Sequence, residues 1–155
     1  LVTLAVSFGG QGAGVNIDQE SGRVVVQKMW TAHDCGTVLN PMAVEGQLEG
    51  SVQMGLGYAL TEEVRFEKGV IRDLNFDTYE IPRFSMVPEI KAVIVQDVNA
   101  APQGGGEPAI VCMGAVIANA IFDAPVTTVD SATAVAREVA TVLEELGGVA
   151  AILRY

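Results

Sequence analysis

The sequence predicts an α+β fold, in which the strands of a mixed sheet pack against two or three helices. Segments with strand character come first, and the helical segments that follow lack the regular strand–helix–strand rhythm of a doubly wound sheet. Half of the 155 residues are apolar, and the charged fraction is ordinary for a globular protein. The chain can therefore build one modest core.

The N-terminal part of the chain is expected to form strands. Residues 2–8 have strand character, and the glycine-rich residues 9–14 are expected to form a bend or a bulge. Residues 15–18 and 23–30 are predicted to be two further strands, which a turn at residues 19–22 joins.

A long helix is predicted to begin at Asn40 and Pro41, because Asn is a good N-cap and Pro suits the first helical position. The apolar residues at helical spacing are Val44, Leu48, Val52, Leu56, Ala59 and Leu60. Four glycines interrupt the helix, namely Gly46, Gly50, Gly55 and Gly57. Each costs roughly 0.5–1 kcal/mol relative to Ala. We therefore expect a neighbouring backbone or a ligand to approach this helix closely.

The middle of the chain predicts a hairpin over residues 64–72 that turns at 67–69. Residues 74–81 and 90–97 are predicted strands, and prolines mark the connection between them.

Two more helices are expected towards the C-terminus. Pro108 suits the first turn of one helix, whose apolar residues are Ile110, Met113, Ile117 and Ile121. Asp130 is expected to cap the other, which carries Val135, Val139, Val142 and Leu146 and stops at two glycines.

The formal net charge is −10, and the chain has no basic cluster. A nucleic acid or an anionic membrane surface is therefore not an expected partner, because binding to either needs a positively charged surface on the protein. The chain shows neither an 18-residue apolar run nor a signal peptide, so we expect a cytoplasmic protein without a membrane span. It begins without Met, which suits a processed chain or a piece of a longer one.

The two cysteines, Cys35 and Cys112, lie far apart and form no CxxC motif. This spacing predicts neither a disulfide framework nor an iron–sulfur or zinc cluster held by this chain alone. His33 and Cys35 would share one face of a strand, but two ligands do not make a metal site. We expect both side chains to be structural.

The stretch APQGGGEPAIV, residues 101–111, places three glycines directly before one carboxylate, Glu107. Glycines permit a tight bend and a close approach to the backbone. Because Glu107 precedes Pro108, we expect it to be extended and to lie at the N-cap of the following helix, where the helix dipole favours negative charge.

Two other interpretations of this stretch stay open on these residues alone. Acidic residues are common in first helical turns and glycine-rich loops are common in general, so the arrangement suits a purely structural role. A phosphate cradle is the other interpretation. The charge of Glu107 and the lack of a Lys or a Ser/Thr at P-loop spacing count against it.

Four stretches together resemble the molybdenum hydroxylase family, which includes xanthine dehydrogenases and aldehyde oxidoreductases. Residues 104–108 resemble its GxGEP segment, and residues 32–63 resemble its HDxGxxxNPxxVEGQxxGxxxxGxGxAL segment. Residues 76–90 are similar to its YxIPxxxDxP run, with Met86 where Asp is frequent, and residues 114–124 are similar to its AxANAIxDA helix. The resemblance covers residues 2–124.

The resemblance implies that the chain is part of the molybdopterin-binding catalytic subunit of an oxidoreductase. Such an enzyme hydroxylates aldehydes or N-heteroaromatic compounds with oxygen derived from water. In the family the glutamate of GxGEP is the general base, so Glu107 is the implied base here. A positioned base contributes about 10²–10⁴-fold in rate. Gly106 is the implied point of close approach of the cofactor.

The resemblance also implies cofactor contacts from glutamines of the second segment. Some members of the family place a Gln near the molybdenum, just before the GxG. Here Met54 occupies that position and Gln53 lies one residue earlier, which turns its side chain by about 100° around the helix. Gln53 is a candidate cofactor contact. Gln47 is a second candidate, for which a simple intersegment hydrogen bond is an equal alternative.

Residues 1–124 are therefore expected to be the C-terminal part of a molybdopterin-binding domain, and 125–155 a helical tail outside the resemblance. The implied partners are the remainder of this subunit, iron–sulfur and FAD domains or subunits, and a small-molecule substrate. We expect the chain alone to be inactive. The alternative is a non-catalytic fragment or assembly module that holds no cofactor.

Overall fold

The computed structural model describes residues 7–18 and 20–124. Within this part, strands β1 (Phe8–Ile17), β2 (Val24–Asp34) and β5 (Glu89–Val95) form a sheet in the order β1-β2-β5. β1 is antiparallel to β2, whereas β5 is parallel to it, so the sheet is mixed. The predicted α+β class is confirmed. Most of the expected strand over 2–8 lies outside the described residues, which begin at residue 7, and β1 starts at Phe8.

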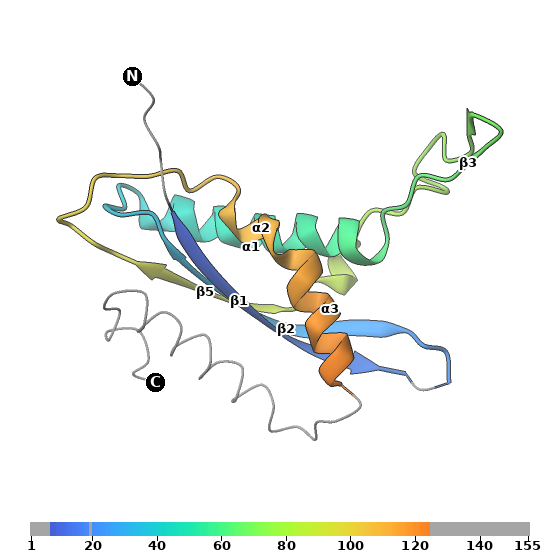
Figure 1. Cartoon of the computed structure of the whole chain (residues 1–155), viewed down its shortest axis with the longest axis horizontal. Coiled ribbons are helices and arrows are strands. Elements are labelled where there is room, and N and C mark those ends of the chain that lie inside the picture. Colours follow the sequence, from blue (N-terminus) through green and yellow to red (C-terminus); the bar gives the residue numbers. More distant parts are fainter. Residues whose placement is uncertain (1–6, 19, 125–155) are drawn as a thin grey trace.

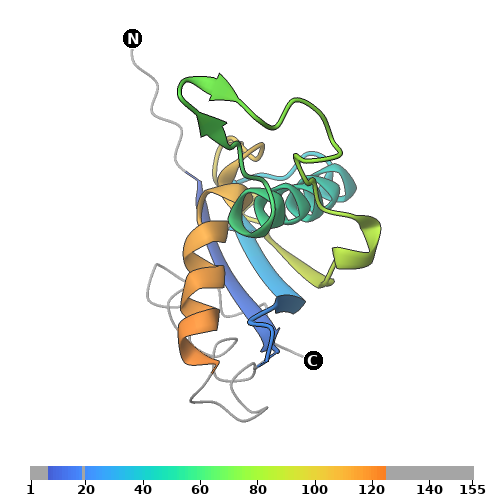
Figure 2. The same ribbon diagram turned by 90° about the vertical axis from the view of Figure 1, so that its right-hand side faces the viewer.

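Three helices lie against this sheet (Figures 1 and 2). They are α1 (Pro41–Leu60), the short α2 (Pro108–Val111) and α3 (Met113–Asp123). The core that they share with the sheet consists of Val26, Met29, Val52, Leu56, Met113 and Ile117. Burial of these apolar side chains is the main force that fixes the helices to the sheet.

The glycine-rich stretch 9–14 does not bend the chain away; it is part of β1. An irregularity does occur where β1 passes Gly14 and Val15, but the extra residue is Gln27 of β2, which is left without a partner in the register. This bulge brings Val26 and Met29 to the same face of the sheet, although they are three positions apart in the sequence. Both side chains therefore reach one core.

Helix α1 begins as predicted. The side chain of Asn40 accepts a hydrogen bond from the backbone N–H of Ala43 at 3.1 Å, and Pro41 is the first helical residue. At Gly55 an added Cβ would lie 2.6 Å from Cβ of Met113, and at Gly57 it would lie 2.9 Å from Cδ of Pro82. A close approach thus occurs at two of the four glycines, but side chains make it and not the backbone or ligand that we expected. Around the other two, Gly46 and Gly50, no described residue comes within 4 Å of a Cβ.

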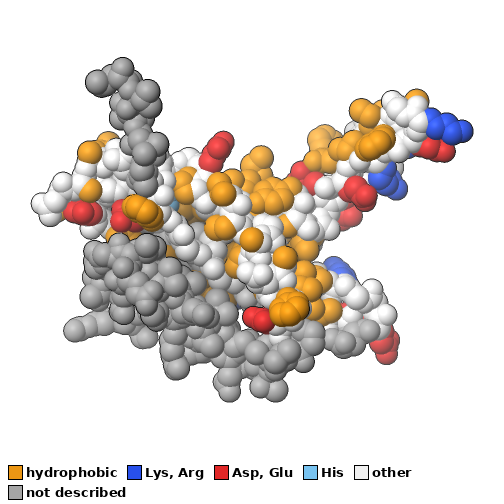
Figure 3. Space-filling model, viewed as in Figure 1, with side chains coloured by type: hydrophobic (Ala, Val, Ile, Leu, Met, Phe, Trp, Pro, Cys, Tyr) orange, Lys and Arg blue, Asp and Glu red, His pale blue; other side chains and the backbone are white. Residues whose placement is uncertain are grey.

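Residues 62–83 leave the body of the molecule as an arm (Figure 1). Its tip is the predicted hairpin, formed by β3 (Phe66–Glu67) and β4 (Val70–Ile71), and Lys68 and Gly69 turn with positive φ. Apolar side chains stay exposed along the arm (Figure 3). They include Phe66, Val70, Ile71, Leu74 and Phe76.

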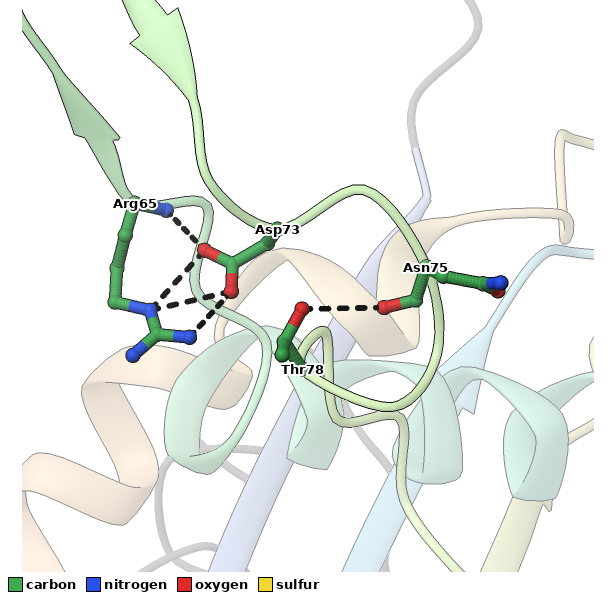
Figure 4. Close-up of polar contacts among 4 residues, drawn as sticks. All are labelled: Arg65, Asp73, Asn75 and Thr78. Atoms are coloured by element: carbon green, nitrogen blue, oxygen red, sulfur yellow. Dashed lines mark hydrogen bonds and ion pairs between the residues drawn. The ribbon is translucent and has the colours of Figure 1, made fainter.

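An ion pair fixes the base of the arm (Figure 4). Asp73 accepts hydrogen bonds from the backbone N–H of Arg65 and from its guanidinium Nη2, both at 2.5 Å. The Asp73 side chain is fully covered, while Arg65 stays half exposed. Hydrogen bonds from Arg65, helped by Thr78, lower the pKa of Asp73 to about 2.

The predicted strand over 74–81 is wrong. This segment folds into turns, in which the backbone N–H groups of Thr78 and Tyr79 both donate to the carbonyl of Asn75 at 3.2 and 2.9 Å. The hydroxyl of Thr78 also points to that carbonyl (Figure 4). Among the described strands none lies beside this segment, so its alternating apolar pattern has no ladder to join.

The strand predicted over 90–97 is confirmed as β5, which ends at Val95 because the chain then turns between Asp97 and Ala100. The helix predicted from Pro108 also forms, but it breaks at Cys112 into α2 and α3. The helix expected after Asp130 lies outside the described residues, and the division at residue 124 stays a prediction. None of the described helices is long and apolar enough to cross a membrane.

Candidate functional site

The glycine loop at residues 104–106 lies beside the turn that follows β2. The backbone N–H of Gln103 donates to the carbonyl of Cys35 at 2.8 Å, and the hydroxyl of Thr37 donates to the carbonyl of Ala100 at 2.6 Å. These two hydrogen bonds join residues 100–103, which lead into the glycine loop, to the turn that follows the central strand β2. None of the three loop glycines adopts a positive φ, so the freedom that we expected them to use is not needed here.

The loop glycines leave room on their outer side. At both Gly104 and Gly106 an added Cβ would meet no described atom within 4 Å. Gly105 instead faces inward, where its Cβ would lie 3.6 Å from Nε2 of His33 and 3.8 Å from Sγ of Cys35. The loop therefore packs on β2 with one glycine and presents open backbone with the other two.

Gln47 connects helix α1 to this loop. Its side-chain Nε2 donates a 2.6 Å hydrogen bond to the carbonyl of Gly106, so two of the predicted cofactor-binding residues are in direct contact. Gln53 is also exposed, but it lies six residues further along α1 and about 240° around the helix axis from Gln47. The structure thus brings Gln47 and Gly106 together and places Gln53 on a different side of the helix.

Glu107 is the N-cap of α2, as predicted, but its backbone is not extended. Its φ of −118° and ψ of −8° are helical, because its own carbonyl already accepts from the N–H of Ile110 at 3.0 Å. The carboxylate does not cap the helix. It is exposed, and among the described residues it has no hydrogen-bond or ion-pair partner. A carboxylate in this state is free to act on a bound molecule.

A shallow pocket of about 380 Å³ opens beside the loop. Residues from the start of α1 and from the glycine loop line this pocket. The polar part of this lining includes Thr37, Asn40, Gln47 and Gln103, together with the backbone of Gly105 and Gly106. Amide side chains and open backbone groups can donate hydrogen bonds to a flat, polar heterocycle and accept them from it.

His33 and Cys35 lie buried beneath the loop. Burial lowers the pKa of His33 and raises the pKa of Cys35, so the imidazole and the thiol are both neutral at pH 7. Neither ring nitrogen of His33 makes a hydrogen bond of good geometry, although the backbone of Phe8 is close enough to act on its pKa. Across the described ranges, no group of three His, Cys, Asp or Glu side chains could hold a metal ion.

Two side chains that were not predicted as site residues, Gln11 and Tyr58, hold the backbone after Glu107. Nε2 of Gln11 donates to the carbonyl of Ala109 at 2.5 Å, and Oε1 of Gln11 accepts from Sγ of Cys112 at 2.9 Å. The hydroxyl of Tyr58 donates to the carbonyl of Ile110. Gln11 stands out in the sequence only as the single polar residue within the glycine-rich run FGGQGAG. Tyr58 and Cys112 carry no comparable sequence signal for these contacts.

A known domain family matches the strands β1 and β2 and the helix α1 that support this site, and the match ends before the glycine loop and Glu107. Residues 2–88 match the molybdopterin cofactor-binding domain. The chain belongs to the molybdenum hydroxylase family. The resemblance inferred from the four motifs is therefore confirmed at the level of the family, and the molybdopterin cofactor is confirmed as its cofactor class.

Three members of the molybdenum hydroxylase family show the extent of the match. The chain is 36% identical over 112 residues, 72% of its length, to a nicotinate dehydrogenase subunit of Pseudomonas putida, of which it covers 9%. It superposes on quinoline 2-oxidoreductase from Pseudomonas putida 86 with a TM-score of 0.71 and 32% identity, covering 76% of this chain and 16% of that one. For the aldehyde oxidoreductase from Desulfovibrio gigas the TM-score is 0.66 and the identity 28%, covering 74% and 13%.

The chain thus spans between 9% and 16% of the lengths of these three relatives. The residues that it contributes to the candidate site are an exposed carboxylate, an open glycine loop and an amide that holds that loop.

Proposed function

We propose that this chain is part of the catalytic subunit of a molybdenum-dependent oxidoreductase that hydroxylates aldehydes or N-heteroaromatic compounds with oxygen from water, with Glu107 as the general base. The observation that carries the proposal is the position of Glu107. Its carboxylate has no partner among the described residues and directly follows an open glycine loop, in a chain of this family. The substrate class follows the names of relatives that act on nicotinate, quinoline and aldehydes.

The residues present fit a molybdopterin. Gly106 offers a carbonyl and an open face, Gln47 offers an amide beside it, and Gln53 is a further candidate contact along α1. These groups suit the hydrogen-bonding edges of a pterin, and the described residues hold no cluster that would ligate the metal directly. When bound, the cofactor would supply the two-electron oxidation and the oxygen transfer, which no side chain of this chain can supply.

The part of Glu107 is to hold and move a proton. The carboxylate is exposed and has no partner in the part of the chain that the structure describes, so it can accept a proton at Oε1 or Oε2 from a neighbouring group. Pro108 follows it directly and is locked at one φ, so the carboxylate is carried on a stiff backbone. A base that stands within hydrogen-bond reach of its proton contributes about 10²–10⁴-fold in rate.

The proposed partners are the rest of the molybdopterin subunit, and iron–sulfur and FAD domains or subunits that carry the electrons away. The small share of its relatives that this chain spans supports the first of these. For the same reason we expect no hydroxylation by this chain alone.

The test is Glu107→Gln in the assembled enzyme, with hydroxylation of quinoline, nicotinate and benzaldehyde as the assay and Glu63→Gln as the matched control. Gln keeps the size and the polarity of the side chain but cannot accept the proton. We expect a loss of about 10²–10⁴-fold for Glu107→Gln with unchanged molybdenum content. Equal rates in the two variants would rule out Glu107 as the base.

A second candidate function is a non-catalytic assembly module. The exposed apolar side chains of the arm, including Phe66 at 74% and Leu74 at 84% exposure, favour a role in association. Purification of the chain under gentle conditions separates the candidates. Molybdenum and pterin that purify with it and a larger partner support the enzyme. A partner-bound chain without either supports the module.

A further inference from the structure

We propose that Gln11 is a positioning residue for Glu107: its side-chain amide ties strand β1 to helix α2 and to Cys112, at the break between α2 and α3, and so fixes where the carboxylate stands. This inference rests on the proposed role of Glu107 and deepens it. Gln11 lies on β1, 96 positions before Glu107 in the sequence, and neither the family motifs nor the pocket lining includes it.

The amide of Gln11 uses both of its ends. Nε2 donates to the carbonyl of Ala109 in α2 at 2.5 Å and lies 3.4 Å from the hydroxyl of Thr31 in β2. Oε1 accepts from the thiol of Cys112, the residue between α2 and α3, at 2.9 Å. Burial raises the pKa of Cys112, so the thiol keeps the proton that it donates.

The break between the helices makes this bridge necessary. Helix α2 has only four residues, and a helix this short is not stable by itself. At the break, the carbonyls of Ala109 and Ile110 accept from side chains of β1 and α1. Ala109 is 5% exposed, so water cannot easily replace the donor from Gln11, whereas Tyr58, which serves Ile110, is 45% exposed. Loss of the hydrogen bond from Gln11 should therefore destabilise α2 more than loss of the one from Tyr58.

The position of Ala109 passes directly to Glu107. Only Pro108 lies between them, and its ring removes most of the local freedom. Among the described residues nothing holds the Glu107 side chain itself, so its backbone alone sets the place of the carboxylate. On the N-terminal side Gln47 holds Gly106, and on the C-terminal side Gln11 holds Ala109. The base stands between these two clamps.

The first experiment measures hydrogen–deuterium exchange of peptides from residues 104–116 in the full enzyme that contains this chain. Gln11→Met keeps the length of the side chain and removes its hydrogen bonds to Ala109, Thr31 and Cys112, and Gln11→Glu keeps the acceptor for Cys112 but loses the donor to Ala109. We expect about tenfold faster exchange in both variants, because a buried carbonyl loses its partner. Gln27→Met, at the exposed bulge residue of β2, is the control and should leave these peptides unchanged. Unchanged exchange in the Gln11 variants would overturn the inference.

The second experiment asks whether Gln11 acts through Glu107. We expect Gln11→Met to lower kcat roughly ten- to a hundredfold with KM little changed, since misplacement of a catalytic group affects the reacting geometry. In the Glu107→Gln background the same substitution should have no further effect, which a purely structural defect would not reproduce. Additive losses would overturn the inference. A Glu107→Gln enzyme of full activity, with faster exchange in the Gln11 variants, would instead contradict the proposed function and confirm the bridge.

Discussion

The side chain of Gln47 and the carbonyl of Gly106 are joined by a hydrogen bond of 2.6 Å. Fifty-nine positions separate the two residues, and both are exposed at the edge of one pocket. The bond ties helix α1 to the loop that leads into Glu107. It gives Gln47 a role whether or not the amide also touches the cofactor.

Removal of this bond should loosen the glycine loop. For Gln47→Leu we expect about two- to tenfold weaker retention of the cofactor, the typical effect of one hydrogen bond at a partly exposed site. Molybdenum and pterin content after dialysis measures it. Gln53→Leu, on another side of the same helix, should have the smaller effect. The reverse order would mean that Gln53 is the main cofactor contact of α1.

The close approach of α1 and α3 at Gly55 predicts a stability effect. For Gly55→Val we expect about 1–3 kcal/mol of destabilisation, because the new side chain would meet Met113, whose Cβ lies 2.6 Å from the position of an added Cβ. Gly46→Ala should stabilise by roughly 0.5–1 kcal/mol, since the site is open within the described structure and Ala is the better helix former. Thermal unfolding of the two variants shows whether each substitution raises or lowers the stability of the fold. A neutral Gly55→Val would contradict the packing described for these helices.

The ion pair at the base of the arm predicts a pH dependence. The pKa of Asp73 is about 2 in the folded chain, below the ordinary value of 3.8, so the carboxylate stabilises the fold at pH values above 3.8. This stabilisation should decline as the pH falls from 3.8 towards 2.

Urea unfolding of the wild type and of Asp73→Asn between pH 7 and pH 2.5 checks this dependence. The difference between them should be constant near neutral pH and shrink in the acidic window. Asp77→Asn, at an exposed carboxylate of the same arm, is the control. If the difference in unfolding free energy between the wild type and Asp73→Asn grew on acidification, the predicted direction of the pH dependence would be wrong.

Burial predicts slow chemistry at both thiols. Desolvation raises the pKa of Cys35 and of Cys112, and only the thiolate reacts readily. We expect both to react with iodoacetamide at pH 8 much more slowly than in the urea-unfolded chain. Mass spectrometry of the alkylated peptides resolves the two sites. Cys112 should become the faster one in Gln11→Met, which removes the acceptor of its proton.

Local sequence signals predicted several elements correctly because their causes are local. Asn40 and Pro41 start α1 through a cap and a fixed φ. Lys68 and Gly69 close the arm hairpin because that turn needs positive φ. Glu107 is at the N-cap of α2 because Pro108 suits the first helical position. In the same way, the spacing within four motifs was sufficient to identify the family.

Other predictions failed where the deciding partner is distant in sequence. Residues 74–81 alternate like a strand but find no described strand to pair with, so they form turns. The glycines of residues 9–14 suggested a bend or a bulge; β2 pairs with them without a bend, and the bulge beside Gly14 has its extra residue, Gln27, in β2. The helix from Pro108 breaks at Cys112, and the break is stabilised by side chains from β1 and α1.

The sequence by itself determined the α+β class, the starts of α1 and α2, the family and the candidate base Glu107. Only the tertiary structure decided which amides hold the backbone on either side of Glu107, because hydrogen bonds from Gln11 and Gln47 span 98 and 59 positions of the chain. Local propensity acts over a few residues, whereas the place of a side chain in a site depends on which segments the core brings together.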